Sequence, residues 1–394
     1  MPKTLLKPNK LNFSDDSGLY HVGDRAFFSK LEAVQHSRNT GQALSWTYKK
    51  DLFSKFNWAV EPQETLWELY SQRAISLREK YNYLIMAYSG GADSTNVLDA
   101  FERNNIMVDE IYIAYHGDHN NPADLEFANN LELYHVAIPR ARELQKRWPN
   151  LKVTVGRMDQ AIVETLEGPL CDEMYYGHNM SWNMIQTTRV ATQWTDKAEW
   201  IPHLGGDLSV GVIYGKDKTV VSTQNGRYCV TFIDRQLNSS FDVLPDNVTR
   251  EFFYWDNETV PMLIKQGHIL KNFFKSAETN PNWFEENKKW FAGPSRRWLW
   301  SELQIANRVT RISTRLYNTL IYPYYNPDIF DIGKVLWQTT DQPMHVLLKR
   351  NPHVRQKYLQ HINQYLSLYG KDSLTLGNVQ VGVQQCYSQP LFLE

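Results

Sequence analysis

Four short, almost wholly apolar runs interrupt the middle of the chain, at residues 83–88, 110–115, 151–155 and 210–214. Runs of this length and composition are typical of strands that are buried on both faces of a sheet. Between them, apolar residues recur every three or four positions, which is the period of a helix with one buried face. Because strands that alternate with helices are joined by right-handed crossovers, the pattern predicts an α/β fold, a parallel sheet with flanking helices.

The sequence also predicts helices and a hairpin beside these strands. Helices are expected over residues 66–81, 96–103, 122–148 and 181–200. Proline interrupts a helix, so the third of these is expected to break near Pro139. Asn225-Gly226 favours a tight turn between two strands. The runs that flank it, 219–222 and 228–233, therefore predict a β-hairpin.

The pattern changes toward both ends of the sequence. Residues 1–61 are polar and aromatic with weak periodicity, and we interpret them as an N-terminal extension. Residues 62–254 contain the alternating strands and helices and form the predicted α/β domain. From residue 255, helical patterns are separated by turns rich in Pro and Asn. Residues 255–394 are therefore predicted to form a mainly helical C-terminal region with a substrate-binding or accessory role.

Composition narrows the class of protein. Lys and Arg number 42 and Asp and Glu 43 among 394 residues, which gives a formal charge of −1. This balance argues against a chain that binds polyanions over its whole surface. It still leaves room for a local basic patch. No apolar run has the roughly 18 residues of a membrane span, and the first residues lack the apolar core of a signal peptide. The expectation is a protein without membrane contact, located in the cytoplasm.

The cysteines and the aromatic residues give two further indications. The three cysteines are Cys171, Cys229 and Cys386, and no CxxC pair occurs. This argues against a thiolate zinc site and against a secreted disulfide scaffold. Aromatic residues make up 13% of the chain, which is compatible either with flat binding surfaces or with a core built from large side chains.

The segment with the clearest chemical meaning follows the first predicted strand and opens a helix. It reads Ser89-Gly90-Gly91-Ala92-Asp93-Ser94 and is called the SGGADS loop below. Adjacent glycines let the backbone turn tightly and approach a phosphate, while the helix N-terminus supplies partial positive charge. Ser89 and Ser94 carry hydroxyl donors for phosphate oxygens. Asp93 would repel a bare phosphate, so its presence suggests a divalent cation, Mg²⁺, between the two.

The other common nucleotide loops, G-x4-G-K-[ST] and G-x-G-x-x-G, do not occur in the sequence. The SGGADS loop resembles the S-G-G-x-D-S loop of the PP-loop ATP pyrophosphatase superfamily, whose adenine nucleotide α-hydrolase-like members include asparagine, GMP and NAD synthetases and tRNA-modifying ligases. The resemblance implies ATP and Mg²⁺ as cofactors. It also implies that an acceptor oxygen attacks the α-phosphorus, that pyrophosphate leaves, and that an amine or ammonia then displaces AMP.

The same resemblance assigns roles outside the loop. The nucleobase and ribose would lie at the end of the second strand, beside Ala114, Tyr115 and His116. Lys216 and Lys218, which leave the fourth strand at the same sheet edge, would act with Asp93 in catalysis by contacting the pyrophosphate. Asp217 would help Asp93 to hold the cation. For each of these residues an ordinary position at a strand end or in an exposed turn is the alternative.

Two further groups are candidates for binding a small-molecule or nucleotide acceptor. His178 and Asn179 follow the third strand, at a place where some tRNA-modifying members carry a G-H-x-x-x-D segment, although Trp182 replaces the carboxylate here. Lys265 and His268 lie on an apolar helix and are candidates to face the active site. For His178, a histidine that merely packs in the core is the alternative.

The basic and aromatic residues of 288–315 form a candidate nucleic-acid surface, with a solvated basic helix as the alternative. Pro2 stands where glutamine-dependent members carry a catalytic cysteine, so no ammonia-generating site is visible. A sulfonucleotide (PAPS) reductase-like or sulfur-transfer enzyme that uses Cys386 is one alternative function, and a catalytically silent adenine-nucleotide or nucleic-acid binding protein is another. The segments 19–24 and 323–325 give a general resemblance to bacteriophage-encoded PP-loop proteins, which would act in the host cytoplasm. Oligomeric state stays open.

Overall fold

The computed structural model describes residues 18–27, 30–115, 117–126, 131–157, 208–215, 219–232, 234, 247–283, 286, 314–324, 349–353, 355–357, 360 and 386–394. The predictions for the helix 181–200 and for most of residues 288–315 lie outside this part of the chain. Among the helices described, none has the length and apolar character needed to cross a bilayer.

A five-stranded parallel sheet forms the centre of the described structure, in the strand order β10-β7-β4-β5-β6. Its strands are β4 (Tyr83–Ala87), β5 (Glu110–Tyr115), β6 (Lys152–Arg157), β7 (Val210–Tyr214) and β10 (Val248–Phe252). The predicted α/β class is confirmed, as are the four predicted strands, although β6 begins one residue later than expected and extends to Arg157. β10 was not expected, because its sequence VTREF places two charged side chains in an edge strand.

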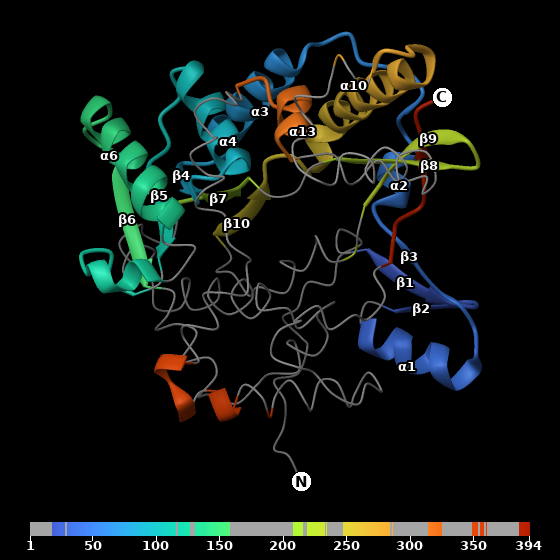
Figure 1. Ribbon diagram of the computed structural model, residues 1–394, viewed down its shortest axis with the longest axis horizontal. Coiled ribbons are helices and arrows are strands. Elements are labelled where there is room, and N and C mark those ends of the chain that lie inside the picture. Colours follow the sequence, from blue (N-terminus) through green and yellow to red (C-terminus); the bar gives the residue numbers. More distant parts are fainter. Residues whose placement is uncertain are drawn as a thin grey trace.

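The helices described around this sheet cover one of its faces (Figure 1). They include α3 (Leu66–Lys80), α4 (Ala92–Arg103), α10 (Val260–Thr279) and α13 (Thr314–Ile321). Side chains alternate along a strand, so Leu84 and Met86 join the large core on the helical side, whereas Ile85 belongs to a smaller cluster on the opposite face. A capping box at Thr65 and Glu68 starts α3 where the apolar pattern begins.

The chain between β5 and β6 corrects one prediction. A 3₁₀ turn, η2 (Pro122–Glu126), is followed by a π-helical segment, η3 (Leu133–Ala137), that continues directly into α6 (Ile138–Arg147). The expected break at Pro139 is wrong, because Pro139 lies in the first turn of α6. There its missing N–H and fixed φ angle are tolerated, and the change from π to α winding occurs just before it.

The described part of the N-terminal extension forms its own small sheet of β1 (Leu19–Val22), β2 (Arg25–Phe27) and β3 (Leu44–Thr47), with α1 (Lys30–Thr40) and α2 (Lys50–Phe53). Aromatic rings join this unit to the rest: Tyr48 packs against Phe53, Phe232 and Trp255, and Trp46 stacks on Tyr48. Among the described residues, the aromatic surplus of the sequence is therefore largely core.

The predicted hairpin is confirmed as β8 (Val220–Gln224) and β9 (Arg227–Thr231), with Asn225 and Gly226 both at positive φ in the turn. It does not join the central sheet. β9 pairs instead with β11 (Leu391–Phe392), which forms a third sheet in the order β11-β9-β8. The described part of 255–394 thus contains α10, α13 and a strand.

Candidate functional site

The SGGADS loop lies at the point where the strand order of the central sheet reverses. From β4 the chain moves to β5 and β6 on one side, and β7 and β10 are then added on the other side of β4. The loops that follow β4, β5 and β7 therefore emerge together at the carboxyl edge. In open α/β sheets this position is where ligands bind, because the loops on either side diverge and leave a crevice.

The loop has the backbone geometry that its glycines allow. Gly90 has a φ of +78°, and a side chain there would meet the backbone nitrogen of Ala137 in η3 at 3.0 Å. The Ser89 and Ser94 hydroxyls lie 3.1 Å apart, and the Ser89 backbone N–H donates to Ser94 Oγ at 3.3 Å. The two serines thus join the two ends of the loop, a contact that the sequence analysis did not predict.

The first turn of α4 offers backbone donors beside these hydroxyls. Gly91 is the N-cap residue, with φ −68° and ψ 164°, and Thr95 makes the first helical hydrogen bond, from its N–H to Gly91 O at 2.9 Å. The N–H groups of residues 92–94 precede this bond and have no acceptor within their own helix. Together with the helix dipole, they form the kind of N-terminus that binds anions.

Two tyrosines from distant parts of the chain hold Asp93. The Tyr322 hydroxyl, which follows α13, donates to Asp93 Oδ1 at 2.7 Å, and the Tyr254 hydroxyl donates to the Asp93 carbonyl at 2.8 Å. Their rings stack, with centroids 5.4 Å apart. Burial and then the Asp93 charge raise the pKa of Tyr322 well above its ordinary value, so the phenol stays protonated and keeps donating to the carboxylate.

A second carboxylate, Glu132, lies over the loop from the segment that precedes η3. Its Oε1 would be 3.6 Å from a Cβ built on Gly91. Burial and then the charge of Asp93 raise the pKa of Glu132 to about 7. Two acidic side chains thus lie near each other at a helix N-terminus, where a cation or a proton would relieve their repulsion.

These carboxylates suit a magnesium ion that a nucleotide brings with it. Mg²⁺ binds oxygen ligands and usually takes one or two carboxylates, its remaining positions being filled by water and substrate phosphates. Within the described residues, no group of three or more His, Cys, Asp or Glu side chains forms a site enclosed by protein alone. Asp93 and Glu132 together fit a magnesium site in which two carboxylates bind the ion and water and substrate phosphates complete its coordination.

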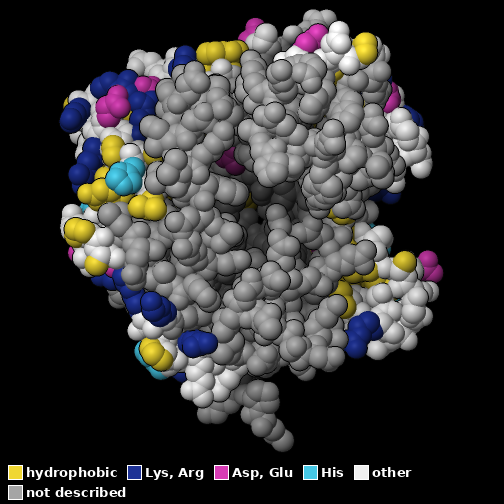
Figure 2. All heavy atoms as spheres, viewed as in Figure 1, with side chains coloured by type: hydrophobic (Ala, Val, Ile, Leu, Met, Phe, Trp, Pro, Cys, Tyr) yellow, Lys and Arg dark blue, Asp and Glu magenta, His cyan; other side chains and the backbone are white. Residues whose placement is uncertain are grey.

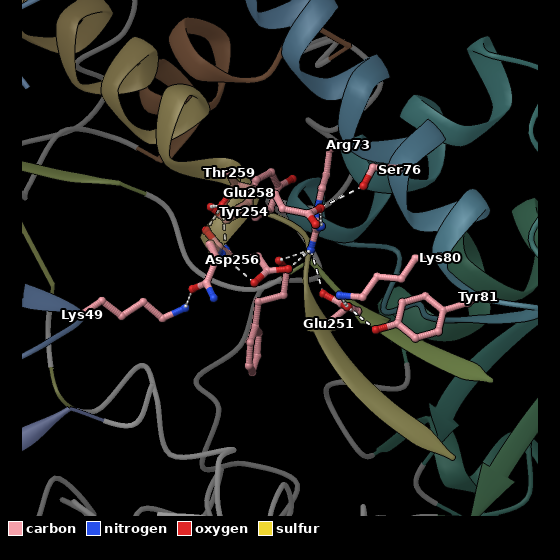
Figure 3. Close-up of polar contacts among 12 residues, drawn as sticks. Lys49, Arg73, Ser76, Lys80, Tyr81, Glu251, Tyr254, Asp256, Glu258 and Thr259 are labelled. Atoms are coloured by element: carbon pink, nitrogen blue, oxygen red, sulfur yellow. Dashed lines mark hydrogen bonds and ion pairs between the residues drawn. The ribbon is translucent and has the colours of Figure 1, made fainter. Parts of the chain in front are cut away.

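A buried ion cluster behind the loop fixes the position of Tyr254 (Figure 3). Arg73 of α3 contacts Glu251 at 2.8 Å, Asp256 at 2.9 Å and Glu258 at 3.2 Å. Glu251 lies in β10, and Asp256 and Glu258 lie between β10 and α10, so these acidic residues flank Tyr254 in the sequence. The Arg73 cluster therefore ties this segment to α3, and through it positions the hydroxyl that holds Asp93.

The end of β7 packs directly on the first turn of α4. A Cβ on Gly215 would come within 2.9 Å of Asp93 O and of Ser94 Cα, so only glycine allows this close approach. The chain thus leaves β7 in contact with the SGGADS loop. Lys216, Asp217 and Lys218 follow immediately but lie outside the described residues, and their assignments stay predictions.

At the end of β5, two of the residues expected beside the nucleobase lie on opposite faces of the sheet. Ala114 packs with the smaller cluster on one face of the sheet, whereas Tyr115 is fully buried in the large core on the other. The two side chains therefore cannot line one side of a nucleobase together. His116 lies outside the described residues. Beyond it, Arg350 donates to Asp124 Oδ1 at 2.6 Å and joins a distant segment to this loop.

Lys265 and His268 of α10 bind the segment before α3. Lys265 Nζ donates to Pro62 O at 2.9 Å and pairs with Glu61, while His268 Nε2 lies 2.9 Å from Trp58 O. Burial lowers the pKa of His268. These contacts are with residues 58–62, and His268 Nδ1 also lies 3.0 Å from Lys271 Nζ in the same helix. The structure therefore does not bring either side chain to the SGGADS loop.

His178 and Asn179 lie outside the described part of the chain. Cys386, the residue on which the sulfonucleotide alternative depends, is buried beside the hairpin, where its carbonyl accepts from the Asp234 N–H at 3.0 Å. The residues that sequence reasoning missed at the loop are Glu132, Gly215, Tyr254 and Tyr322. Their sequence neighbourhoods contain no spacing signal, because the fold brings each of them to the loop from a different element.

Comparisons with known proteins do not assign a family or a function to the chain. No protein-family model matches the chain, and no curated protein matches it. The site is therefore characterised by its own residues: a glycine-rich loop with two serine hydroxyls, a helix N-terminus and two carboxylates at the switch point of a parallel sheet.

Proposed function

We propose that this protein is an ATP pyrophosphatase of the PP-loop type, which adenylates an acceptor oxygen and releases pyrophosphate. The single observation that carries the proposal is the position of the SGGADS loop at the switch point of the sheet β10-β7-β4-β5-β6. A loop of this sequence at any other place in the fold would be an ordinary turn. Here it combines anion donors with the crevice in which α/β proteins bind nucleotides.

The loop supplies the groups that such a reaction needs. The hydroxyls of Ser89 and Ser94, which lie 3.1 Å apart, and the N–H groups of the first turn of α4 would bind the β- and γ-phosphates. Negative charge accumulates on the pyrophosphate as it leaves, and donors already held in position stabilise that charge without reorganisation. Gly215 brings the chain that continues into Lys216 and Lys218 to the same place, which supports a role for those lysines.

Asp93 and Glu132 would hold the magnesium ion of the nucleotide. When bound, the ion neutralises the charge of the phosphate oxygens. The protein's own contribution is orientation: Tyr322 and Tyr254 fix Asp93 at its side chain and at its carbonyl, so the carboxylate needs no rearrangement to bind a ligand.

The test is pyrophosphate release from ATP in the presence of Mg²⁺ and a panel of carboxylate, amide and nucleotide acceptors. We expect Asp93→Ala to abolish release while Asp51→Ala, an exposed acid in α2, leaves it unchanged. Full activity of Asp93→Ala would overturn the assignment. ATP that raises the melting temperature without any turnover would instead identify a silent nucleotide-binding protein, because a ligand bound only to the folded state stabilises it.

A further inference from the structure

Positive charge is concentrated along one side of the described structure. α6 contains four basic residues and one acidic residue, and β6 contains two basic residues and no acidic one. Residues 349–357 contain four Lys and Arg and no Asp or Glu. α6, β6 and residues 349–357 are called the basic stripe below. Because the whole chain has a formal charge of −1, this local excess means that positive and negative side chains are unevenly distributed over the molecule.

Two sets of contacts place the parts of the stripe along one side of the sheet. α6 packs on β6, and Arg350 reaches the loop after β5 through its hydrogen bond to Asp124 at 2.6 Å. Figure 2 shows Lys and Arg side chains along the corresponding edge of the molecule, over α6 and again lower down, on the side where Figure 1 places residues 349–357. The stripe is therefore a surface and not only a run of sequence.

Some of these charges hold the fold together, and others face water. Arg140 and Arg147 pair with Glu102 of α4, and Lys152 lies 3.4 Å from the Glu110 carboxylate. In contrast, four side chains are exposed and form no ion pair within the described residues: Arg142, Lys146, Lys349 and Arg355. Arg142 and Lys146 are four residues apart and so share one face of α6. This set has no internal role to explain it.

The stripe begins at the SGGADS loop. η3 contacts the loop through Ala137 and Gly90, and it continues into α6. At this junction Tyr134 is 42% exposed, and its ring lies edge-on to that of the exposed His135, with centroids 5.2 Å apart. Exposed rings beside basic groups are the elements with which proteins stack bases and bind the phosphates between them.

We propose that the basic stripe binds the sugar–phosphate backbone of a nucleic acid and leads it to the SGGADS loop, so that the acceptor oxygen belongs to a nucleotide of that polymer. The second half of this proposal rests on the proposed function, whereas the first half does not. An anionic membrane fits less well. Binding to a bilayer requires an apolar face, and no large hydrophobic side chain is exposed on the described part of the stripe, Tyr134 of the adjoining η3 being the nearest in sequence to α6.

The test measures the binding of fluorescently labelled single-stranded and double-stranded RNA and DNA oligonucleotides by anisotropy, without ATP, at several salt concentrations. We expect the double variant Arg142→Glu/Lys146→Glu to lose at least about tenfold in affinity and to show a shallower dependence of affinity on salt, because fewer counterions are released. The neutral double variant Arg142→Gln/Lys146→Gln should show a smaller loss of affinity. This variant tests the proposal if the charge reversal perturbs the folding of α6.

The matched control is Arg38→Glu/Lys55→Glu, which changes the same charge at exposed positions in α1 and after α2, on the opposite side of the molecule (Figure 1). It should bind within about twofold of the wild type, since its charges lie outside the stripe. Equal losses in both reversal variants would overturn the proposal, as would wild-type protein that binds no oligonucleotide or binds only phosphatidylserine vesicles. Asp93→Ala should still bind nucleic acid, so a failure of the proposed function is distinguishable from a failure of the stripe.

Discussion

Two acidic clusters lie close together in this fold, and they differ in how their charge is balanced. Around Arg73, three carboxylates share a guanidinium, and Lys80 adds a second cation at 2.8 Å from Glu251. At the SGGADS loop, Asp93 and Glu132 lie near the N-terminus of α4, and the charge of Asp93 adds to burial in raising the pKa of Glu132. The first cluster is built around cations, whereas Asp93 accepts hydrogen bonds from the neutral hydroxyls of Tyr322 and Tyr254 at its side chain and its carbonyl.

The pKa directions express the same difference. Burial by itself would raise the pKa of Asp256, but the charge of Arg73 and further hydrogen bonds outweigh burial and lower it. For Glu132, burial and Asp93 act together and raise the pKa to about 7. A cluster built around cations stabilises the fold, whereas a carboxyl group with a raised pKa at a loop of this kind is a candidate for binding a ligand. Three variants test this distinction.

The largest effect is expected at Arg73. Arg73→Met would leave Glu251 and Asp256 buried without their main counterion, and we expect a loss of about 3–5 kcal/mol in the free energy of unfolding. Urea unfolding followed by circular dichroism measures it. Glu258→Gln is the control: because that side chain is 54% exposed, its loss should cost at most about 1 kcal/mol. Equal effects of the two variants would contradict the structural role of the cluster.

A smaller effect of opposite sign is expected at Glu132. The pKa rises from 4.5 to about 7 on folding, so the folded protein holds this proton more tightly than the unfolded chain. The resulting stability is complete below about pH 4.5 and is lost as the pH rises through about 7. Glu132→Gln should therefore be more stable than the wild type at pH 8, by about 1–2 kcal/mol after allowance for solvent screening.

The measurement for Glu132 is the urea midpoint across this pH range. The advantage of Glu132→Gln should shrink toward acidic pH, while Glu143→Gln, an exposed position on α6, should leave the pH dependence of the wild type unchanged. A difference that stays constant with pH would show that the substitution acts through packing rather than through charge.

The third variant concerns the contact between Tyr322 and Asp93. Tyr322→Phe removes one buried hydrogen bond to a charged group and should cost about 1.5–3 kcal/mol at most, and less where water replaces the hydroxyl. Its informative readout is the binding of Mg-ATP by calorimetry. If Tyr322 positions Asp93, affinity should fall while the Arg73 cluster stays intact; unchanged affinity would show that the loop carboxylate needs no such support.

The sequence predicted the strands of the central sheet because they are buried on both faces and contain almost no polar residue. It predicted the hairpin because Asn225-Gly226 specifies the turn. It did not predict β10, since the strand contains Arg250 and Glu251, whose charges are stabilised by tertiary contacts. Arg250 lies over the Tyr214 ring, and Glu251 pairs with Arg73 and Lys80. Local composition cannot report a partner that is distant in the sequence.

In the candidate site too, some residues follow from the local sequence and others depend on the fold. The geometry of Ser89, Gly90 and Ser94 follows from local rules, because a positive φ and a helix N-terminus require these residue types. The side chains that complete the site come from η3, the turn after β10 and the segment after α13. Lys265 and His268 show the converse, since an apolar helix with polar residues gave no indication that these would bind residues 58–62.

β11 has a consequence for how the protein is made. It supplies two residues, Leu391 and Phe392, to the sheet with β9, and the Glu394 side chain accepts from the Tyr228 N–H, 166 positions earlier in the sequence. Such distant pairings form late, because a long loop must close before the contact is gained. During synthesis β9 cannot pair with β11 until the residues between these two strands have left the ribosome. A chaperone that shields a strand edge would be most useful in that interval.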